Sequence, residues 1–463
     1  MNTASLTPTT GATQELAAFA ARLTFDQLPA PVIERLKHCV LDALGCCIFG
    51  VTLPWTRMLI DLVREEGSNP QSRIIGTDYK ASISQAVLIG ATAGHGFEMD
   101  DIHAAAHLHA GSLALPAALA LAETLPALDG RALTAALAAG YEVGLRVSLA
   151  ATGALFMRGH HFQGACGPFV AAATAANLLK LSPEAARHAL GIAGSFGAGL
   201  MAAQEGAMSK RLHCGRAAQA GVQGAQLAAR GFTGIPNVLE ASYGGFLSTL
   251  SGAPDLSRLS DGLGTRWEIL SVGFKPYATA ASVQSVLFAV DGLMADNSLA
   301  AQDIERVHIH CSTMAHRHCA WPYQPIGVTA AQMNLFFTTA MMIIDRAAMQ
   351  DQFTDARLTD PSALAMIERI SIEVDPAYDV GGDTTRHCAR VALTTKEGRT
   401  LKREVLDRPG SPANPLQPQH LQRKFEALAG PVLPADRVAK VIATVARLED
   451  EKVASLIDLV TIQ

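Results

Sequence analysis

The chain has 463 residues, a formal net charge of −5, and 49% hydrophobic but only 17% charged residues. This length predicts about two or three domains with a sizeable core. The acidic balance and the lack of a basic run argue against a nucleic-acid partner. We expect neither a secretory signal in residues 1–30 nor a membrane span, because the most apolar tract, 189–203, falls short of about 20 residues.

The eight cysteines show no C-x-x-C pair and no zinc or iron–sulfur spacing. Paired or clustered cysteines are the usual mark of a disulfide framework or of a metal site. We therefore expect all eight to be reduced core residues of a cytoplasmic protein.

Residues 1–13 are rich in threonine and are predicted to be disordered. From Gln14 onward, apolar residues recur at three- and four-residue steps, which predicts one helix after another. Small residues dominate these segments, so we expect closely packed helices in a single helical domain over residues 14–268. The predicted helices are 16–23, 31–49, 84–95, 111–125, 130–151, 167–179, 183–203 and 216–230.

The pattern changes near Trp267. Strands are predicted at 304–312, 370–375, 390–395 and 400–405, with a hairpin turn at 396–399 and helices at 278–294 and 329–349. This order predicts a small α+β domain over residues 269–405. A proline-rich connector and helices at 421–429 and 434–446 follow, and we expect residues 406–463 to return to the helical domain. The predicted fold is mainly α, with an inserted α+β domain.

Polar residues gather in four short clusters. The densest runs from Gly94 to Gly111 and holds three carboxylates and four imidazoles. The others are 158–164, 209–215 and 273–277. Each is predicted near a helix N-terminus, where free N–H groups and the helix dipole favour anions. Together they offer the lysines, arginines and histidines that a di- or tricarboxylate site requires.

The clusters also allow other interpretations. His103 and His107 would stand one turn apart on a helix and, with His109, would suit a zinc hydrolase. Lys210 would suit a Schiff-base enzyme. A carboxylate-binding protein without catalysis is a further alternative. Taken singly, the histidine pair at 160–161 is typical of a helix cap, and a Lys–Arg pair is typical of a solvated surface.

The clusters and their surroundings resemble the MmgE/PrpD family, over about residues 14–425. The resemblance rests on Glu98-Met99-Asp100-Asp101 through His109-Ala110-Gly111, on Gly159-His160-His161 through Cys166-Gly167, on Lys210-Arg211-Leu212-His213-Cys214-Gly215 through Gly231-Phe232-Thr233-Gly234, and on Phe274-Lys275-Pro276-Tyr277. The family includes 2-methylcitrate dehydratase, cis-aconitate decarboxylase and iminodisuccinate epimerase.

The resemblance implies a large all-helical domain, a smaller inserted α+β lid domain and a homodimer, with the active site in the cleft between the domains. The acidic position of the family falls on Glu98, where aspartate is usual. The two site histidines fall on His109 and His161, and the two lysines on Lys210 and Lys275.

This sequence departs from the family pattern in several places. Ile102 stands where threonine is usual, and Gln284 lies near the place of a histidine. Residues 334–337, Asn-Leu-Phe-Phe, lack the hydroxyls common there, and Tyr323 is a candidate replacement phenol. Glutamine can hydrogen-bond a carboxylate but cannot carry a proton at neutral pH.

The family's reactions share a proton transfer at a carbon next to a carboxylate, which needs a tuned base and fixed cations. We therefore predict a cofactor-independent lyase, a dehydratase or decarboxylase of a small di- or tricarboxylate. An epimerase or isomerase of a dicarboxylate is the alternative. The predicted catalytic residues are His109, His161, Lys210, Lys275, Glu98, Asp101 and His103, with Glu98 or Asp101 orienting a histidine. The predicted substrate-binding residues are Lys210, Arg211, Lys275, His213, Gln284 and Tyr323.

Overall fold

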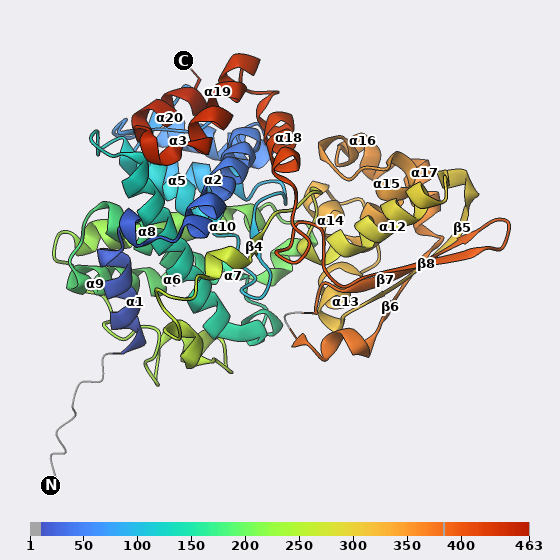
Figure 1. Ribbon diagram of the computed structural model, residues 1–463, viewed down its shortest axis with the longest axis horizontal. Helices are drawn as coiled ribbons and strands as arrows, with labels where there is room; N and C mark the ends of the chain where they lie inside the picture. The colour runs from blue at the N-terminus through green and yellow to red at the C-terminus, as the bar shows by residue number, and fades with distance from the viewer. Residues whose placement is uncertain (1–10, 383–384, 463) are drawn as a thin grey trace, which may run out of the picture.

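The computed structural model describes residues 11–382 and 385–462, most of them helical. A helical body occupies one side of Figure 1, and its core is built from residues before 275 and after 420. Its first helices are α1 (Ala12–Arg22), α2 (Ala30–Gly50), α3 (Pro54–Glu66), α4 (Ile83–Gly94), α5 (Gly111–Ala122), α6 (Gly130–Met157), α7 (Phe162–Ala165), α8 (Gly167–Leu178), α9 (Pro183–Gly194), α10 (Ser209–Ala228) and α11 (Phe246–Leu250).

Glycines let the central helices of this body approach closely. A Cβ atom on Gly140 of α6 would lie 1.9 Å from Oγ1 of Thr174 on α8. One on Gly144 would lie 2.1 Å from Cγ2 of Val170, also on α8. Real Cβ atoms are not found at such distances, so this helix pair needs residues without side chains at both positions.

The second body is a four-stranded sheet covered by helices, with a separate core. The strand order is β6-β5-β7-β8, in which β5 and β6 are parallel and the other pairs antiparallel. The strands are β5 (Ile304–Cys311), β6 (Ile370–Val374), β7 (Ala389–Thr395) and β8 (Thr400–Val405). The helices are α12 (Gln284–Asp296), α13 (Thr313–Cys319), α14 (Val328–Met333), α15 (Leu335–Asp345), α16 (Asp355–Leu358) and α17 (Pro361–Ile367).

The C-terminal helices lie on the helical body (Figure 1). They are α18 (Pro418–Ala429), α19 (Ala435–Ala446) and α20 (Val453–Val460). Leu421 and Phe425 of α18 belong to the core of the helical body. Lys424, on the same helix, forms a buried ion pair of 2.6 Å with Asp42 of α2 and donates a hydrogen bond to the carbonyl of Met99. The chain therefore leaves the helical body and returns to it.

Short strands complete the described elements: β1 (Ser72–Arg73) pairs with β2 (Lys80–Ala81), and β3 (Ile102–His103) with β4 (Val272–Gly273). The mainly α character with a β-containing second body agrees with the sequence. Among the described residues, no one helix has both the length and the apolarity of a membrane span; α2 and α3 together do, across a bend of 74°.

Several helix boundaries differ from the prediction. The helix predicted at 183–203 ends at Gly194, because the next residues cross α7, where the N–H of Ala198 bonds the carbonyl of Gly164. Helix α10 begins at Ser209 instead of residue 216. Helix α1 begins at Ala12, inside the segment predicted to be disordered, because Glu240 accepts hydrogen bonds from the backbone and hydroxyl of Thr13; residues 1–10 lie outside the described part.

Candidate active site

A cavity lies where the two bodies meet. The helical body contributes residues of the loop before α5, of the segment around α7 and of α10, and the second body closes the opposite side. The lining residues are Glu98, Ile102, His107, His109, Phe156, His161, Phe162, Met201, Lys210, Ala280, Ala281, Ser282, His318, Met333, Arg386 and His387. Imidazoles and cations therefore line one shared cavity.

The loop between α4 and α5 has an unusual backbone. Glu98 and His107 have φ values of 57° and 56°, in the left-handed region that side chains other than glycine rarely adopt. The residues from 104 to 107 form a turn, closed by the hydrogen bond from the N–H of His103 to the carbonyl of Leu108. The expectation that His103 and His107 stand one helical turn apart is therefore wrong.

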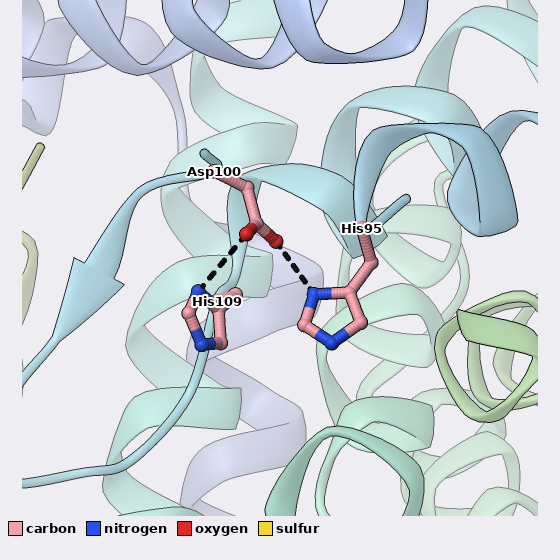
Figure 2. Close-up of side chains that lie close together, drawn as sticks. All are labelled: His95, Asp100 and His109. Carbon is pink, nitrogen blue, oxygen red and sulfur yellow. Dashed lines mark hydrogen bonds and ion pairs between the residues drawn. The ribbon is translucent and has the colours of Figure 1, made fainter. Parts of the chain in front are cut away.

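Asp100 joins two of the loop's imidazoles (Figure 2). Its Oδ2 accepts a hydrogen bond of 2.8 Å from Nδ1 of His95, and its Oδ1 lies 3.3 Å from Nδ1 of His109. Nδ1 of His109 also donates a hydrogen bond of 2.7 Å to the carbonyl of Asp101. Since carbonyls and carboxylates only accept, Nδ1 of His109 is protonated and its Nε2 is the basic nitrogen. Asp100 was part of the motif but was not assigned a role, and His95 was missed.

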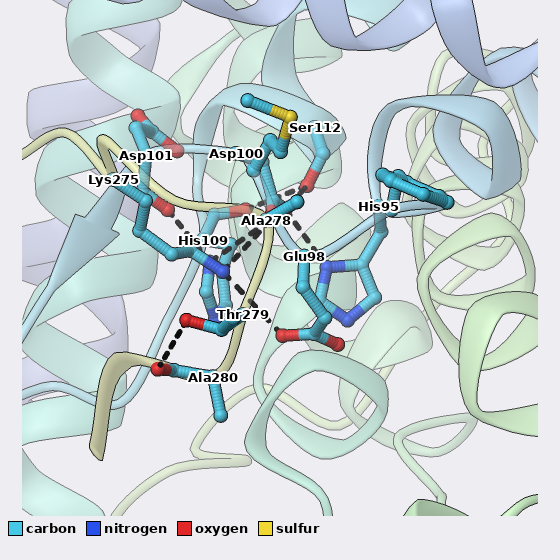
Figure 3. A network of polar contacts seen from close by, with 12 residues as sticks. His95, Glu98, Asp100, Asp101, His109, Ser112, Lys275, Ala278, Thr279 and Ala280 are labelled. Atoms are coloured by element: carbon cyan, nitrogen blue, oxygen red, sulfur yellow. Dashed lines mark hydrogen bonds and ion pairs between the residues drawn. The ribbon is translucent and has the colours of Figure 1, made fainter. Parts of the chain in front are cut away.

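Glu98 is surrounded by three cations, one of which, Lys275, is labelled in Figure 3. Its Oε1 pairs with Nζ of Lys210 and with Nη1 of Arg211, and its Oε2 lies 3.4 Å from Nζ of Lys275. Lys275 also lies 3.5 Å from Oδ1 of Asp100. Burial alone would raise the pKa of Glu98, but the three cations lower it well below its usual value. Glu98 therefore stays ionised and contacts cations instead of a histidine.

His161 stands on the cavity wall, at the residue before α7. Its Nδ1 lies 3.0 Å from Nδ1 of His213, which is half-buried behind it and does not line the cavity. Burial, followed by the charge of Lys210, lowers the pKa of His161 well below its usual value. Burial also lowers the pKa of His95 to about 4. Both imidazoles are therefore neutral at pH 7.

The second body supplies a basic wall that sequence reasoning missed. Nη1 of Arg386 lies 2.8 Å from Nδ1 of His107, and Nη2 donates to the carbonyl of Ala104 at 2.8 Å. Nδ1 of His318 lies 3.0 Å from Oγ of Ser282. Arg386 and His318 follow no recognisable motif and lie more than 200 residues beyond the loop between α4 and α5. No signal in a single sequence could have found them.

Several predicted residues lie outside the cavity lining. Nε2 of His103 is 3.6 Å from Glu268, and the side chain of Asp101 accepts bonds from the hydroxyl of Tyr141 and the N–H of Gly111. Burial, then the charge of a neighbouring carboxylate, raises the pKa of Asp101 to about 7. Neither side chain orients a cavity histidine. Lys275 and Arg211 lie behind Glu98, fully buried.

Gln284 and Tyr323, the candidates to replace side chains that are usual in the family, also lie outside the cavity lining. The amide nitrogen of Gln284 donates to Thr279 and to the carbonyl of Tyr277. The hydroxyl of Tyr323 donates to the carbonyl of Leu358 at 2.9 Å, and its ring stacks on Phe337. Each therefore satisfies backbone groups of the second body instead of lining the cavity.

One group at the site has the donor atoms of a metal centre. Atoms of His95, Asp100 and His109 lie within 4.8 Å of one another. The trio His103, His107 and His109, on which the zinc interpretation depended, does not converge in this way among the described residues. His107 contacts the guanidinium of Arg386, a cation that opposes metal binding.

Comparison with known proteins gives relatives that match nearly the whole chain. A cis-aconitate decarboxylase of Aspergillus terreus is 29% identical over 93% of this chain and 92% of its own length. The cis-aconitate decarboxylase-like protein oryM of Aspergillus oryzae is 28% identical over 97% of each chain. Human cis-aconitate decarboxylase is 28% identical over 95% of this chain and 92% of its own. The MmgE/PrpD N-terminal domain model matches residues 14–259 and the C-terminal domain model matches residues 277–450, so the chain belongs to the MmgE/PrpD family.

Proposed function

We propose that this protein is a cofactor-independent lyase that decarboxylates cis-aconitate or a closely related tricarboxylate. The observation that carries the proposal is the convergence of His109, His161 and Lys210 on one cavity whose far wall holds Arg386 and His318. A tricarboxylate needs cations on more than one side, and the relatives named above act on such a substrate by their names.

In the proposed mechanism, Lys210 binds a substrate carboxylate. Its pKa is lowered by burial, against the raising effect of Glu98, while Glu98 pairs with it and fixes its position. A second carboxylate binds toward Arg386 on the opposite wall. Lys275 lies behind Glu98 and Asp100, where it offsets the charge of both carboxylates and holds them in place. Fixed charges of this kind stabilise the carbanion that forms as CO₂ leaves.

The histidines carry the proton in this proposal. Loss of neutral CO₂ from a tricarboxylate trianion leaves a carbanion that takes up one proton to give a dicarboxylate dianion. A neutral imidazole with a protonated Nε2 can supply it, and His161 and His109 both line the cavity. Nε2 of His109 carries no proton in this structure, so we assign the donated proton to His161, while His109 forms part of the cavity wall.

Proton NMR of the purified protein with cis-aconitate in heavy water tests the proposal. We expect the substrate signals to be replaced by those of a dicarboxylate with one deuterium, together with CO₂. His161→Asn should abolish this, whereas His160→Asn should not, because His160 lies outside the cavity lining. Deuterium exchange without CO₂ release would favour an epimerase or isomerase, and loss or gain of water would favour a dehydratase.

We also propose the quaternary and domain arrangement that the family resemblance implies. Residues 269–405 act as a lid over the cavity, and two copies of the chain form a homodimer. Light scattering coupled to size exclusion should give twice the chain mass of 48.7 kDa. A mass equal to one chain at micromolar concentration would contradict the dimer.

A further inference from the structure

The proton that the reaction consumes must be replaced without leaving a charge on the donor. If His161 gave up its Nε2 proton alone, the ring would become an imidazolate, a strongly disfavoured anion in a buried site. A neighbouring group that gives a proton to Nδ1 of His161 as Nε2 loses one would keep the ring neutral and avoid the imidazolate. The structure places one such group in contact with His161.

That group is His213, on α10. The two Nδ1 atoms lie 3.0 Å apart and the ring centroids 5.2 Å apart. Because two bare nitrogens repel each other, one Nδ1 is protonated and the other accepts. Gly199 passes over the pair: a Cβ atom there would lie 3.2 Å from Nδ1 of His213 and 3.4 Å from Cβ of His161. The contact is therefore enclosed from one side by the backbone.

His213 also reaches a second hollow on the outside of the helical body. This outer groove is lined by Gly164, Phe196, Ala198, Gly199, Leu200, Ala202, Ala203, Ala207, Ser209, His213, Arg216 and Ala217. Phe196 and Leu200 on its rim are 63% and 66% exposed. His161 lines the inner cavity and His213 the outer groove, so the imidazole pair connects the two spaces.

We propose that His213 acts as a proton relay between solvent in the outer groove and His161, which rests on the lyase function proposed above. As a proton from solvent binds Nε2 of His213, its Nδ1 proton moves to Nδ1 of His161, and the Nε2 proton of His161 moves to the substrate carbon. Each ring gains one proton and loses one, so both stay neutral. After the product leaves, a solvent proton binds Nε2 of His161, the Nδ1 proton of His161 returns to Nδ1 of His213, and His213 releases its Nε2 proton to the outer groove, which restores both tautomers.

The surrounding charges suit neutral rings. Lys210, His95 and Glu98 face His161, and Lys210 also faces His213. Burial and Lys210 lower the pKa of each of the two imidazoles, although Glu98 opposes this at His161. At pH 7 the pair therefore shares a single proton between its Nδ1 atoms instead of repelling as two cations.

Two variants separate a relay from simple orientation. His213→Asn keeps an amide near the place of Nδ1 that can hold His161, but it cannot pass a proton. His213→Ala removes the ring and leaves a space open to the outer groove. We expect kcat for cis-aconitate to fall at least about tenfold in both, with KM within about twofold of wild type. Imidazole in the buffer should restore kcat of His213→Ala and leave His213→Asn unchanged.

Wild-type kcat in His213→Asn, or no rescue of His213→Ala by imidazole, would overturn the relay while leaving the lyase function intact. If wild-type protein does not turn over cis-aconitate, the lyase function fails, and ¹⁵N NMR of the histidines decides the relay separately. We expect His161 and His213 to show opposite tautomers in rapid exchange, with the His161 signal changed in His213→Asn. Two fixed rings, each with a permanent tautomer, would refute the relay.

Discussion

Asp100→Asn tests the carboxylate that holds two of the site's imidazoles. Asp100 lies 2.8 Å from Nδ1 of His95 and 3.3 Å from Nδ1 of His109, and Oγ of Ser112 donates to it at 2.9 Å. The pairing imidazoles and Lys275 lower its pKa well below the usual value, although burial opposes them. An asparagine fills the same space without the charge, and its amide can present a donor to nitrogens that already carry protons.

The size of the effect follows from the hydrogen bonds that are lost. A hydrogen bond to a charged group contributes about 1.5–3 kcal/mol. If the arrangement of the site depends on the hydrogen bond from His95 to the charged Asp100, Asp100→Asn should lower kcat by about 10- to 150-fold. KM should change less, because Asp100 does not line the cavity.

The assay is steady-state kinetics with cis-aconitate, with circular dichroism to verify folding. Ser112→Ala is the matched control, because it removes one bond to Asp100 and keeps the charge. We expect it to lose less than about tenfold in kcat, because the charge of Asp100 and its contacts with both imidazoles remain. A folded Asp100→Asn enzyme with kcat within twofold of wild type would refute the reasoning.

Lys210→Met should lower kcat/KM by at least about a hundredfold because its ammonium group lines the cavity, and an unchanged value would remove Lys210 from the site. Lys275→Met should instead lower the free energy of unfolding, measured by urea denaturation, by about 3–5 kcal/mol, because the buried carboxylates of Glu98 and Asp100 lose one cation. A change under about 1 kcal/mol would contradict this. Burial lowers the pKa of His318 in the folded protein to about 3, from about 6.5 in the unfolded chain. Between these pH values only the unfolded protein binds the proton, so the free energy of unfolding decreases as the pH falls. His318→Gln should therefore lose about 2–3 kcal/mol less than wild type between pH 7 and 4.5, whereas the exposed control His420→Gln should follow wild type; parallel curves for His318→Gln would show the reasoning to be wrong. EDTA should leave turnover unchanged, and activity lost to EDTA but restored by zinc would favour the zinc hydrolase alternative.

The sequence was most informative where the residues that line the cavity belong to short motifs. Glu98, His109, His161 and Lys210 come from three separate motifs, and the structure brings them to one cavity. Motif residues of this kind can be read from local composition and resemblance. The mainly helical fold followed from the spacing of apolar residues, because burial of one helix face leaves a periodic record.

The roles of neighbouring carboxylates could not be read in this way. In the folded loop, where Glu98 has a φ of 57°, Asp100 contacts the imidazoles and Asp101 contacts Tyr141. Nothing in the order of residues encodes that choice. The role of His318 could not be predicted from the sequence either, because His318 belongs to the second body and only tertiary packing brings it to the cavity.

The small sheet between β3 and β4 determines which parts of the site move together. Ile102 pairs with Gly273, so the acidic loop and the segment carrying Lys275 form one hydrogen-bonded unit on the helical side. If the two bodies separate to admit substrate, as the proposed lid implies, this unit would keep its internal distances. The parts that would move are those of the second body, Arg386 and His318 among them. Opening would then expose the charged group of Glu98, Lys210 and Lys275 with its contacts intact, and closing would add only the wall that the second body contributes.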